Sequence, residues 1–291
     1  MEFVSSLNKA LRGYIARHNV NPFIRRFAAR IWSWFVNKRE SIELVVNGMP
    51  VRLIPYYRSF SETYEPEVFR ALEKLLPGFQ TFVDVGANMG LYTILASRKM
   101  NRNSRIISIE ANPFTFDILT RHLSLNGIPG RVIALRKAIA DSSGQVVHFG
   151  ATVSNAGDPC ARIQKTAGGS VEATTLSLDD LMAGEDHGRT LIKVDVEGAE
   201  HLVLRGAVQQ MRSSMPPVFL LAVHPMFLPE FGVSPAQVLS LLRENDYAVF
   251  NKHGIAVGEL VYDEYWCVSR RHAAEFVPRL SDLKAKHAIT H

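Results

Sequence analysis

Cysteine is scarce in this sequence, which contains two cysteines among 291 residues. Cys160 and Cys267 lie far apart, and neither has a cysteine or histidine nearby at the spacing of metal ligands. A disulfide framework and a zinc site are therefore both disfavoured. We expect two reduced thiols with packing roles.

Long apolar runs are also missing. The longest apolar stretches, such as residues 218–223, fall far short of the ~20 residues that a membrane-spanning helix needs. The N-terminal region is rich in arginine and has no charge-free apolar core, so it does not resemble a cleavable secretory signal. We therefore expect no transmembrane segment and a cytoplasmic protein.

Positive charge is concentrated at the N-terminus. Residues 1–40 contain eight Lys or Arg and two Glu, a net charge of +6, whereas the whole chain carries +5. The rest of the chain is therefore almost neutral and offers no obvious surface for tracking phosphates. This distribution disfavours nucleic acid as a partner.

The basic N-terminal segment also has the pattern of an amphipathic helix. Aromatic and aliphatic residues recur at spacings of four, four and three: Phe23, Phe27, Ile31 and Trp34. Such a helix either lies in a lipid interface or packs on its own domain or on a second copy of the chain. Peripheral membrane contact and a homo-oligomer therefore both remain open.

The segment that follows is predicted to form a hairpin and a helix. Asn47-Gly48 favours the positive φ angles of a tight turn between strands within residues 43–54. A helix over 66–76 then ends at Pro77-Gly78. The predicted division of the chain is a basic helical extension (1–40), a hairpin with its lead-in helix (41–78), a main domain (79–272) and a C-terminal tail (273–291).

Strand and helix signals alternate from residue 80 onward. Strands are predicted over 81–85, 105–110, 132–139, 191–194, 218–223, 247–251 and 265–268. Helices are predicted over 91–98, 113–126, 176–182, 200–211 and 235–244, with an antiparallel extension inserted over 142–175. This alternation predicts an α/β fold with a parallel, doubly wound sheet covered on both faces.

The first motif that carries chemistry is Asp84-Val-Gly-Ala-Asn-Met-Gly90, at the end of the first strand. A dinucleotide fingerprint that starts at Gly86 needs glycine where Asn88 and Leu91 stand, so a nicotinamide cofactor is disfavoured. An acid two residues before Gly-x-x-x-Gly suits a ligand with a cationic amino group and a compact carboxylate.

Glu110 follows the second strand, where a carboxylate can accept both ribose hydroxyls. An adenosyl ligand with an amino-acid tail would satisfy both Asp84 and Glu110, and that ligand is S-adenosylmethionine. The simpler alternative is that each acid only caps a strand end. Asp141, beyond the third strand, could reach the adenine amino group or could serve only as a turn residue.

Three further polar residues follow the fourth and fifth strands: Asp195, Glu197 and His224. Neighbouring parallel strands bring their carboxyl ends to one edge of the sheet, so we expect the three side chains to lie close together. Imidazole titrates near neutral pH and can take a hydroxyl proton. The two carboxylates could also hold Mg²⁺, but we favour no metal. Glu200, in the first turn of its helix, has two open explanations, the helix dipole alone and a role in the site.

Several of these segments together resemble the FkbM-type family of S-adenosylmethionine-dependent O-methyltransferases. They are Tyr64-Glu-Pro66, Asp84-Val-Gly-Ala-Asn-Met-Gly-Leu-Tyr-Thr93, Glu110-Ala-Asn-Pro113, Leu125-Asn-Gly127 and Lys193-Val-Asp-Val-Glu-Gly-Ala-Glu200. The resemblance implies a seven-stranded class I methyltransferase (Rossmann-like) fold and methylation of a hydroxyl on a sugar, glycan, glycolipid or natural product. Members often carry an acid two positions before the histidine matched by His224, where this chain has Ala222.

The sequence therefore predicts an O-methyltransferase. The expected contacts are Asp84 to the methionine end of the cofactor, Gly86, Asn88 and Gly90 to its backbone cradle, Glu110 to its ribose, Asp141 to its adenine, and Asp195, Glu197 and His224 to the acceptor. One alternative is a methyltransferase for a small natural product. The other is a non-catalytic module that binds an adenosyl ligand and is recruited through its basic N-terminal helix.

Overall fold

A computed structural model of the protein describes residues 41–128, 130–149, 171–184 and 186–285. The predicted N-terminal amphipathic helix and Cys160 lie outside these residues. Cys267 is a free thiol buried in the core, as expected. Within the described part of the chain, no helix has both the length and the apolar character needed to cross a bilayer.

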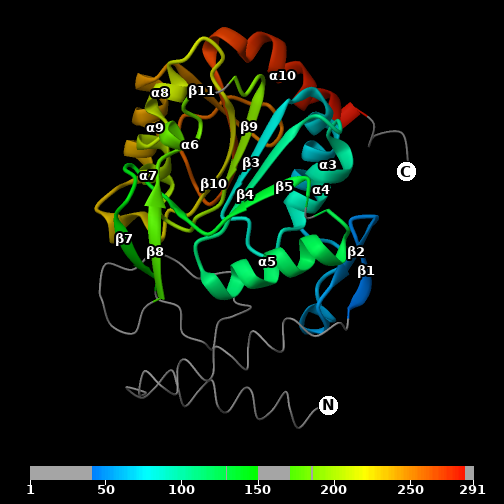
Figure 1. Ribbon diagram of the computed structural model, residues 1–291. Coiled ribbons are helices and arrows are strands. Elements are labelled where there is room, and N and C mark those ends of the chain that lie inside the picture. Colours follow the sequence, from blue (N-terminus) through cyan, green and yellow to red (C-terminus); the bar gives the residue numbers. More distant parts are fainter. Residues whose placement is uncertain (1–40, 129, 150–170, 185, 286–291) are drawn as a thin grey trace.

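A seven-stranded sheet with the order β11-β12-β10-β9-β3-β4-β5 forms the centre of the fold (Figure 1). Its strands are β3 (Thr81–Val85), β4 (Arg105–Ile109), β5 (Val132–Leu135), β9 (Thr190–Val194), β10 (Val218–Val223), β11 (Tyr247–Asn251) and β12 (Asp263–Ser269). The α/β sheet is therefore confirmed, with one correction. Strand β12 runs antiparallel to both β10 and β11, so the sheet is mixed rather than wholly parallel.

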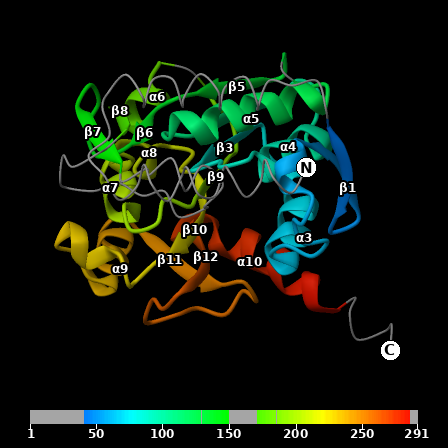
Figure 2. The same ribbon diagram turned by 90° about the horizontal axis from the view of Figure 1, so that it is seen from below.

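Helices cover both faces of this sheet, as a doubly wound fold requires (Figures 1 and 2). One face carries α3 (Pro66–Leu75), α4 (Leu91–Lys99), α5 (Pro113–Leu125) and α10 (Arg270–Ala285), and the other carries α6 (Leu178–Leu181), α7 (Glu200–Arg205), α8 (Val208–Met211) and α9 (Pro235–Glu244). Successive strand residues alternate between the two sides. Phe82 packs in one hydrophobic cluster and Val83 in the other, because neighbouring side chains of a strand point to opposite faces.

The N-terminal hairpin consists of β1 (Ile42–Val46) and β2 (Met49–Leu53) and turns at Asn47-Gly48, as predicted. A buried histidine ties the chain after β2 to the main domain. His122 accepts a hydrogen bond from the Ile54 amide at 3.1 Å through Nε2, and its Nδ1 lies 2.9 Å from the carbonyl oxygen of Met89. The lead-in segment therefore belongs to the same packed unit as the sheet.

The predicted strand over 132–139 is in fact two strands. Only β5 joins the main sheet, while β6 (Ala138–Ile139) joins a three-stranded sheet of order β6-β8-β7. There β7 (Val146–Phe149) and β8 (Val171–Leu176) pair in antiparallel fashion, which agrees with the predicted extension. The helix predicted over 176–182 begins later, because Leu176 ends β8 and the Ser177 side chain caps α6.

Two other boundaries differ from expectation. The helix predicted over 200–211 breaks into α7 and α8 at Gly206, where an added Cβ would lie 2.1 Å from the carbonyl oxygen of Ala140. The backbone of Ala140 therefore packs directly against this break. The predicted C-terminal tail is largely the helix α10, which buries Phe276 and Leu280 against the main hydrophobic cluster.

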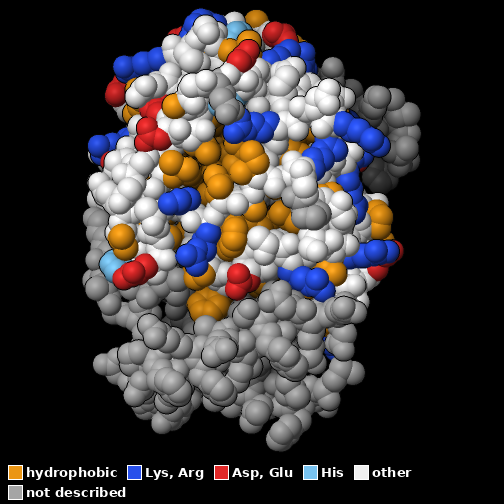
Figure 3. Space-filling view, viewed as in Figure 1, with side chains coloured by type: hydrophobic (Ala, Val, Ile, Leu, Met, Phe, Trp, Pro, Cys, Tyr) orange, Lys and Arg blue, Asp and Glu red, His pale blue; other side chains and the backbone are white. Residues whose placement is uncertain are grey.

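The surface in Figure 3 has hydrophobic side chains gathered near its middle, with Lys and Arg side chains around them. Exposed large hydrophobic residues include Ile133 on β5, a strand at the edge of the main sheet, and Tyr56 and Tyr262, which lie at the cavity described below.

Candidate active site

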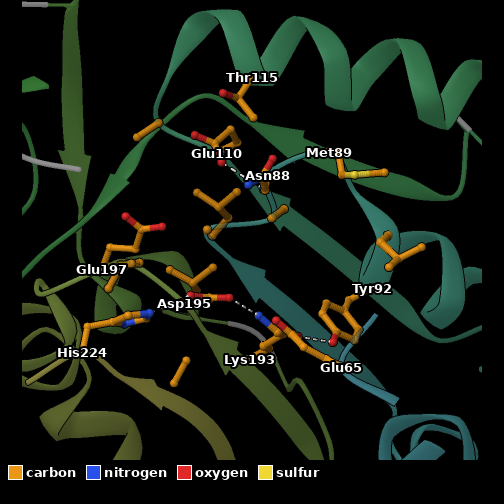
Figure 4. A pocket seen from close by; sticks show the side chains of 18 of the residues that line it. Glu65, Asn88, Met89, Tyr92, Glu110, Thr115, Lys193, Asp195, Glu197 and His224 are labelled. Carbon is orange, nitrogen blue, oxygen red and sulfur yellow. Dashed lines mark hydrogen bonds and ion pairs between the residues drawn. The ribbon is translucent and has the colours of Figure 1, made fainter. Parts of the chain in front are cut away.

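A cavity of about 820 Å³ opens at the carboxyl ends of β3, β4, β9 and β10. The chain passes from β3 to β4 on one side, and β9 lies on the other side of β3. This is the switch point at which open α/β sheets bind ligands. Figure 4 shows Glu110, Asn88 and Thr115 in one part of the cavity, and Asp195, Lys193, Glu197 and His224 in another.

The loop after β3 is held close to the loop after β9. A Cβ added to Gly86, whose φ is +77°, would lie 1.9 Å from the carbonyl oxygen of Asp195. Only glycine satisfies that approach and that backbone angle. Asn88 also has a left-handed backbone, with φ +49°, and both residues line the cavity. Gly90 does not line it, and a Cβ there would meet Leu119 of α5 at 2.6 Å.

Glu110 supports this loop and also faces the cavity. Its Oε2 accepts a hydrogen bond from the Asn88 amide at 2.9 Å, and its Oε1 accepts one from the Asn112 amide at 2.8 Å. Burial raises the pKa of Glu110 to about 7, although these backbone bonds favour the ionised form. The predicted ribose-binding acid is therefore positioned in the wall of the cavity.

Two other predicted cofactor residues lie behind the wall or away from it. Asp84 is buried and accepts a hydrogen bond from the Thr93 hydroxyl at 2.6 Å, while its Oδ1 has no hydrogen-bond partner among the described residues. Burial raises its pKa. Asp141 pairs with Arg205 at 3.4 Å. Neither acid lines the cavity, so a direct contact of Asp141 with adenine has no support in this geometry.

Lys193 is a cavity residue that the sequence interpretation missed. Its side chain is 4% exposed, and Nζ donates to Oδ2 of Asp195 at 2.9 Å. Nζ also lies 4.8 Å from the centre of the Tyr92 ring, and the Tyr92 hydroxyl donates to Glu65. The available signal was a lysine inside the apolar strand β9, since a buried lysine needs a charged partner.

The structure brings His224 next to two carboxylates. Nδ1 of His224 lies 2.8 Å from Oε1 of Glu200, a fully buried residue, and Nε2 lies 3.9 Å from Oδ1 of Asp195. Burial lowers the pKa of His224, but the Glu200 hydrogen bond and the charges of Asp195, Glu200 and Glu197 outweigh it and raise that pKa. Glu200 is therefore a partner of His224, and the helix dipole alone does not account for it.

Glu197 enters the cavity from a tight turn between β9 and α7. Its φ is +49°, and Gly198, with φ +105°, follows it. A Cβ on Gly198 would lie 2.7 Å from that of Phe227, so this glycine lets the turn pass close to the chain after β10. The three predicted acceptor residues therefore line one cavity.

Two cavity acids come from outside the strand ends. Glu65 is the N-cap residue of α3, with φ +41°, and Glu264 lies on β12 directly opposite Ala222 of β10. Burial and the nearby charge of Glu65 raise the pKa of Glu264 to about 7. The carboxylate that is absent at position 222 is thus present on the neighbouring strand. The sequence could not indicate this, because the pairing of β12 with β10 depends on the sheet order.

Metal-binding geometry is not found in the part of the chain that the structure describes: it contains no group of three or more His, Cys, Asp or Glu placed to hold an ion. Because Asp195 is already paired with Lys193, metal-free function remains our prediction.

Comparison with known proteins identifies the family to which this chain belongs. The methyltransferase FkbM domain matches residues 84–249, more than half of the chain. The hexuronic acid methyltransferase AglP of Haloferax volcanii is 30% identical over 208 residues, which are 71% of this chain and 77% of that protein. The methyltransferase sdnD of Sordaria araneosa is 36% identical over 69 residues, which are 24% of this chain and 26% of that protein.

Solved structures give a weaker likeness. An O-methyltransferase from Bacillus cereus in complex with SAH has a TM-score of 0.41 at 12% identity, with 89% of this chain and 96% of that chain covered. A precorrin-6y C5,15-methyltransferase from Geobacter metallireducens has a TM-score of 0.40 at 12% identity, with coverages of 72% and 89%.

The predicted class I methyltransferase fold agrees with the sheet order, and the predicted family agrees with the domain match. On the extent of that match and the identity to AglP, this chain is a methyltransferase of the FkbM family.

Proposed function

We propose that the protein transfers a methyl group from S-adenosylmethionine to a hydroxyl of a sugar, glycan or glycolipid. The observation that carries this proposal is the pairing of His224 with buried Glu200 beside Asp195, in the same cavity as Glu110 and the Gly86 loop. One cavity thus holds Glu110, which we assign to the nucleoside, and His224, which we assign as the base that takes the hydroxyl proton. The family and the sugar-modifying relative named above support the same reaction class.

The residues present fit S-adenosylmethionine. Glu110 faces the cavity with two oxygens that can accept ribose hydroxyls in addition to their backbone bonds. Gly86 and Asn88 line the cavity along the adjoining loop. The unsatisfied Oδ1 of Asp84 lies just behind this loop, and a buried carboxylate oxygen without a partner is costly. An ammonium group bound over the loop would offset that cost through a bridging water.

When bound, S-adenosylmethionine would supply an electrophilic methyl carbon, to which the acceptor oxygen would bond as the carbon–sulfur bond breaks and S-adenosylhomocysteine leaves. Nε2 of His224 then takes the hydroxyl proton, while Glu200 accepts the hydrogen bond from Nδ1–H and holds the ring. Asp195 stabilises the imidazolium that forms, and Lys193 holds Asp195 in place. General-base catalysis of this kind contributes about 10²–10⁴-fold, and orientation contributes up to about 7–11 kcal/mol.

Titration calorimetry tests the cofactor assignment. We expect S-adenosylmethionine and its demethylated product to bind with micromolar affinity and NAD not to bind. Binding of NAD in place of S-adenosylmethionine would refute the assignment. Labelled methyl transfer to a cell extract would then reveal the acceptor, and single-turnover transfer to any hydroxyl excludes a non-catalytic binding module. A small natural product as the labelled acceptor would favour the alternative substrate class.

We further propose that residues 1–40 bring the enzyme to an anionic membrane surface, where lipid-linked sugars offer hydroxyls. Support comes from the sequence alone, namely the net charge of +6 and the aromatic stripe. Each basic residue near such a surface adds about 1 kcal/mol. Deleting residues 1–40 should abolish sedimentation with anionic vesicles and leave the oligomeric state unchanged. A truncation that instead converts a dimer to a monomer, from a parent that ignores vesicles at low salt, would identify an oligomer interface.

A further inference from the structure

The acceptor end of the cavity is acidic. Glu65 and Glu264 lie on opposite sides of the family-matched segment 84–249, yet both line the cavity with the matched residues. In the antiparallel pairing of β10 with β12, Glu264 stands opposite Ala222, two residues before His224. A molecule that presents a hydroxyl to His224 therefore lies beside Glu264.

Negative charge exceeds positive charge among the residues that line the cavity. The acidic residues are Glu65, Glu110, Asp195, Glu197, Asp263 and Glu264, and the lysines are Lys137 and Lys193. Lys193 pairs with Asp195, and Lys252 lies 3.6 Å from Asp263. Among the described residues, by contrast, no cation lies within ion-pair distance of Glu264.

Glu65 adds to this charge and is held in place. Its carboxylate accepts the Tyr92 hydroxyl, and its backbone is fixed at the start of α3. Burial, followed by repulsion from Glu65 and Asp263, leaves the Glu264 carboxylate poorly stabilised, which is why its pKa is raised. A cationic group placed beside these acids gains attraction in a partly desolvated site, whereas an added carboxylate meets repulsion.

Aromatic rings border the same acids. Tyr262 precedes Asp263 and Glu264, and its ring centre lies 5.5 Å from that of His224. Tyr64 precedes Glu65 and lines the cavity. Aromatic faces attract cations and offer apolar contact to a ring-shaped ligand. The wall that faces His224 therefore combines aromatic rings with the carboxylates of Glu65 and Glu264, for which the described part of the chain provides no ion pair.

From this juxtaposition we propose that Glu264 and Glu65 determine acceptor specificity. They select a hydroxyl compound that carries a positively charged amino group, such as an amino sugar, and they disfavour acceptors with a carboxylate. The proposal rests on the hydroxyl-methylating function given above. It separates this chain from AglP, whose name states a hexuronic acid substrate.

Binding to the protein loaded with S-adenosylhomocysteine tests the proposal without any methyl transfer. The probes are glucosamine, methyl glucoside and glucuronate, measured by ligand-observed NMR at constant ionic strength near pH 7. We expect glucosamine to bind about tenfold more tightly than methyl glucoside, equivalent to about 1.4 kcal/mol, and glucuronate to bind most weakly. Glu264→Gln and Glu65→Gln should each reduce the ratio of glucosamine to glucuronate affinity by at least about threefold.

A matched control and a second readout identify the origin of any effect. Glu244→Gln removes an exposed carboxylate from α9, where its sole hydrogen bond within the described residues is to Ser240, and should leave the ratio unchanged. Thermal unfolding verifies that each variant is folded. Equal or absent binding of glucosamine, or tighter binding of glucuronate, overturns the proposal. The proposal is also overturned if Glu264→Gln weakens S-adenosylhomocysteine binding and leaves the ratio of glucosamine to glucuronate affinity unchanged. That result would assign Glu264 to the cofactor. If the affinity ratios are as expected but no methyl group is transferred to any hydroxyl, the proposed function is refuted and the charge selectivity stands.

Discussion

Glu110 makes a sharp prediction, because one side chain both supports the Gly86 loop and faces the cavity. Its pKa of about 7 means that about one tenth of it is ionised at pH 6 and about nine tenths at pH 8. The ionised form is the one that accepts the Asn88 and Asn112 amides and still has lone pairs for ribose hydroxyls. We therefore expect S-adenosylhomocysteine to bind about tenfold more weakly at pH 6 than at pH 8.

The assay is titration calorimetry at about pH 6, 7 and 8 with wild type, Glu110→Gln and Glu264→Gln. Glu110→Gln should bind more weakly at pH 8 and lose the pH dependence that Glu110 causes. Ionisation of the ligand itself affects all three proteins equally. Glu264→Gln serves as the matched control, because its acid also has a pKa of about 7 but lies at the acceptor end. A pH slope retained in Glu110→Gln, or lost in Glu264→Gln, would refute the assignment of Glu110 to the ribose.

Folding stability provides an independent check on the sign of the Glu110 shift. Its folded pKa of about 7 lies above the ordinary value of 4.5, so the folded protein holds this proton more tightly than the unfolded chain. The contribution of Glu110 to stability therefore declines as the pH rises from about 4.5 to about 7. Urea unfolding of Glu110→Gln should lack that decline.

Four further predictions concern separate parts of the site. His224→Gln should lower kcat by about 10²–10⁴-fold and leave S-adenosylhomocysteine affinity within a factor of about two, as measured by single-turnover kinetics and calorimetry. Gly86→Ala should destabilise the fold by more than the ~1–2 kcal/mol expected for a positive φ alone. Gly48→Ala, whose added Cβ meets no atom within 4 Å, should cost only that amount. Similar denaturation midpoints for the two variants would contradict the close approach of Gly86 to Asp195. Burial lowers the pKa of His122 from 6.5 to about 4. The neutral ring therefore contributes up to about 3 kcal/mol to the free energy of unfolding above pH 6.5, and this contribution is lost as the pH falls toward 4. Urea titrations should show this loss in wild type and not in His122→Gln. Exhaustive chelation should leave methyl transfer unchanged, and a loss that Mg²⁺ restores would overturn the metal-free prediction.

Local patterns in the sequence predict the framework of the site. Gly86 and Asn88 stand where a strand passes into a helix and need unusual backbone angles, which short motifs reveal. Glu110 ends the next strand, and the carboxyl ends of parallel strands meet at one edge. These inferences require only strand boundaries and the direction of the strands, and those follow from the alternation of apolar strands with helices.

Two predicted cofactor contacts stay predictions, because neither side chain is among those that line the cavity. Asp84 was expected to contact the cofactor, but it lies behind the loop because its strand is buried on both faces. Asp141 was placed near the adenine, but the chain turns into β6 after β5, and the acid pairs with Arg205. The position of Asp84 depends on depth within the sheet and that of Asp141 on the path of the chain after a strand, and local patterns determine neither.

The sequence by itself determined the α/β class, the family and the two strand ends that carry Glu110 and the Asp195-Glu197 pair, because each depends on patterns of a few consecutive residues. Only the tertiary structure decided which side chains complete the cavity. Lys193 reaches Asp195 through burial in β9, Glu200 reaches His224 across 24 positions of sequence, and Glu264 faces the cavity because β12 inserts between β10 and β11. These contacts depend on strand order and on desolvation, which arise from packing the whole chain and leave no local pattern in the sequence.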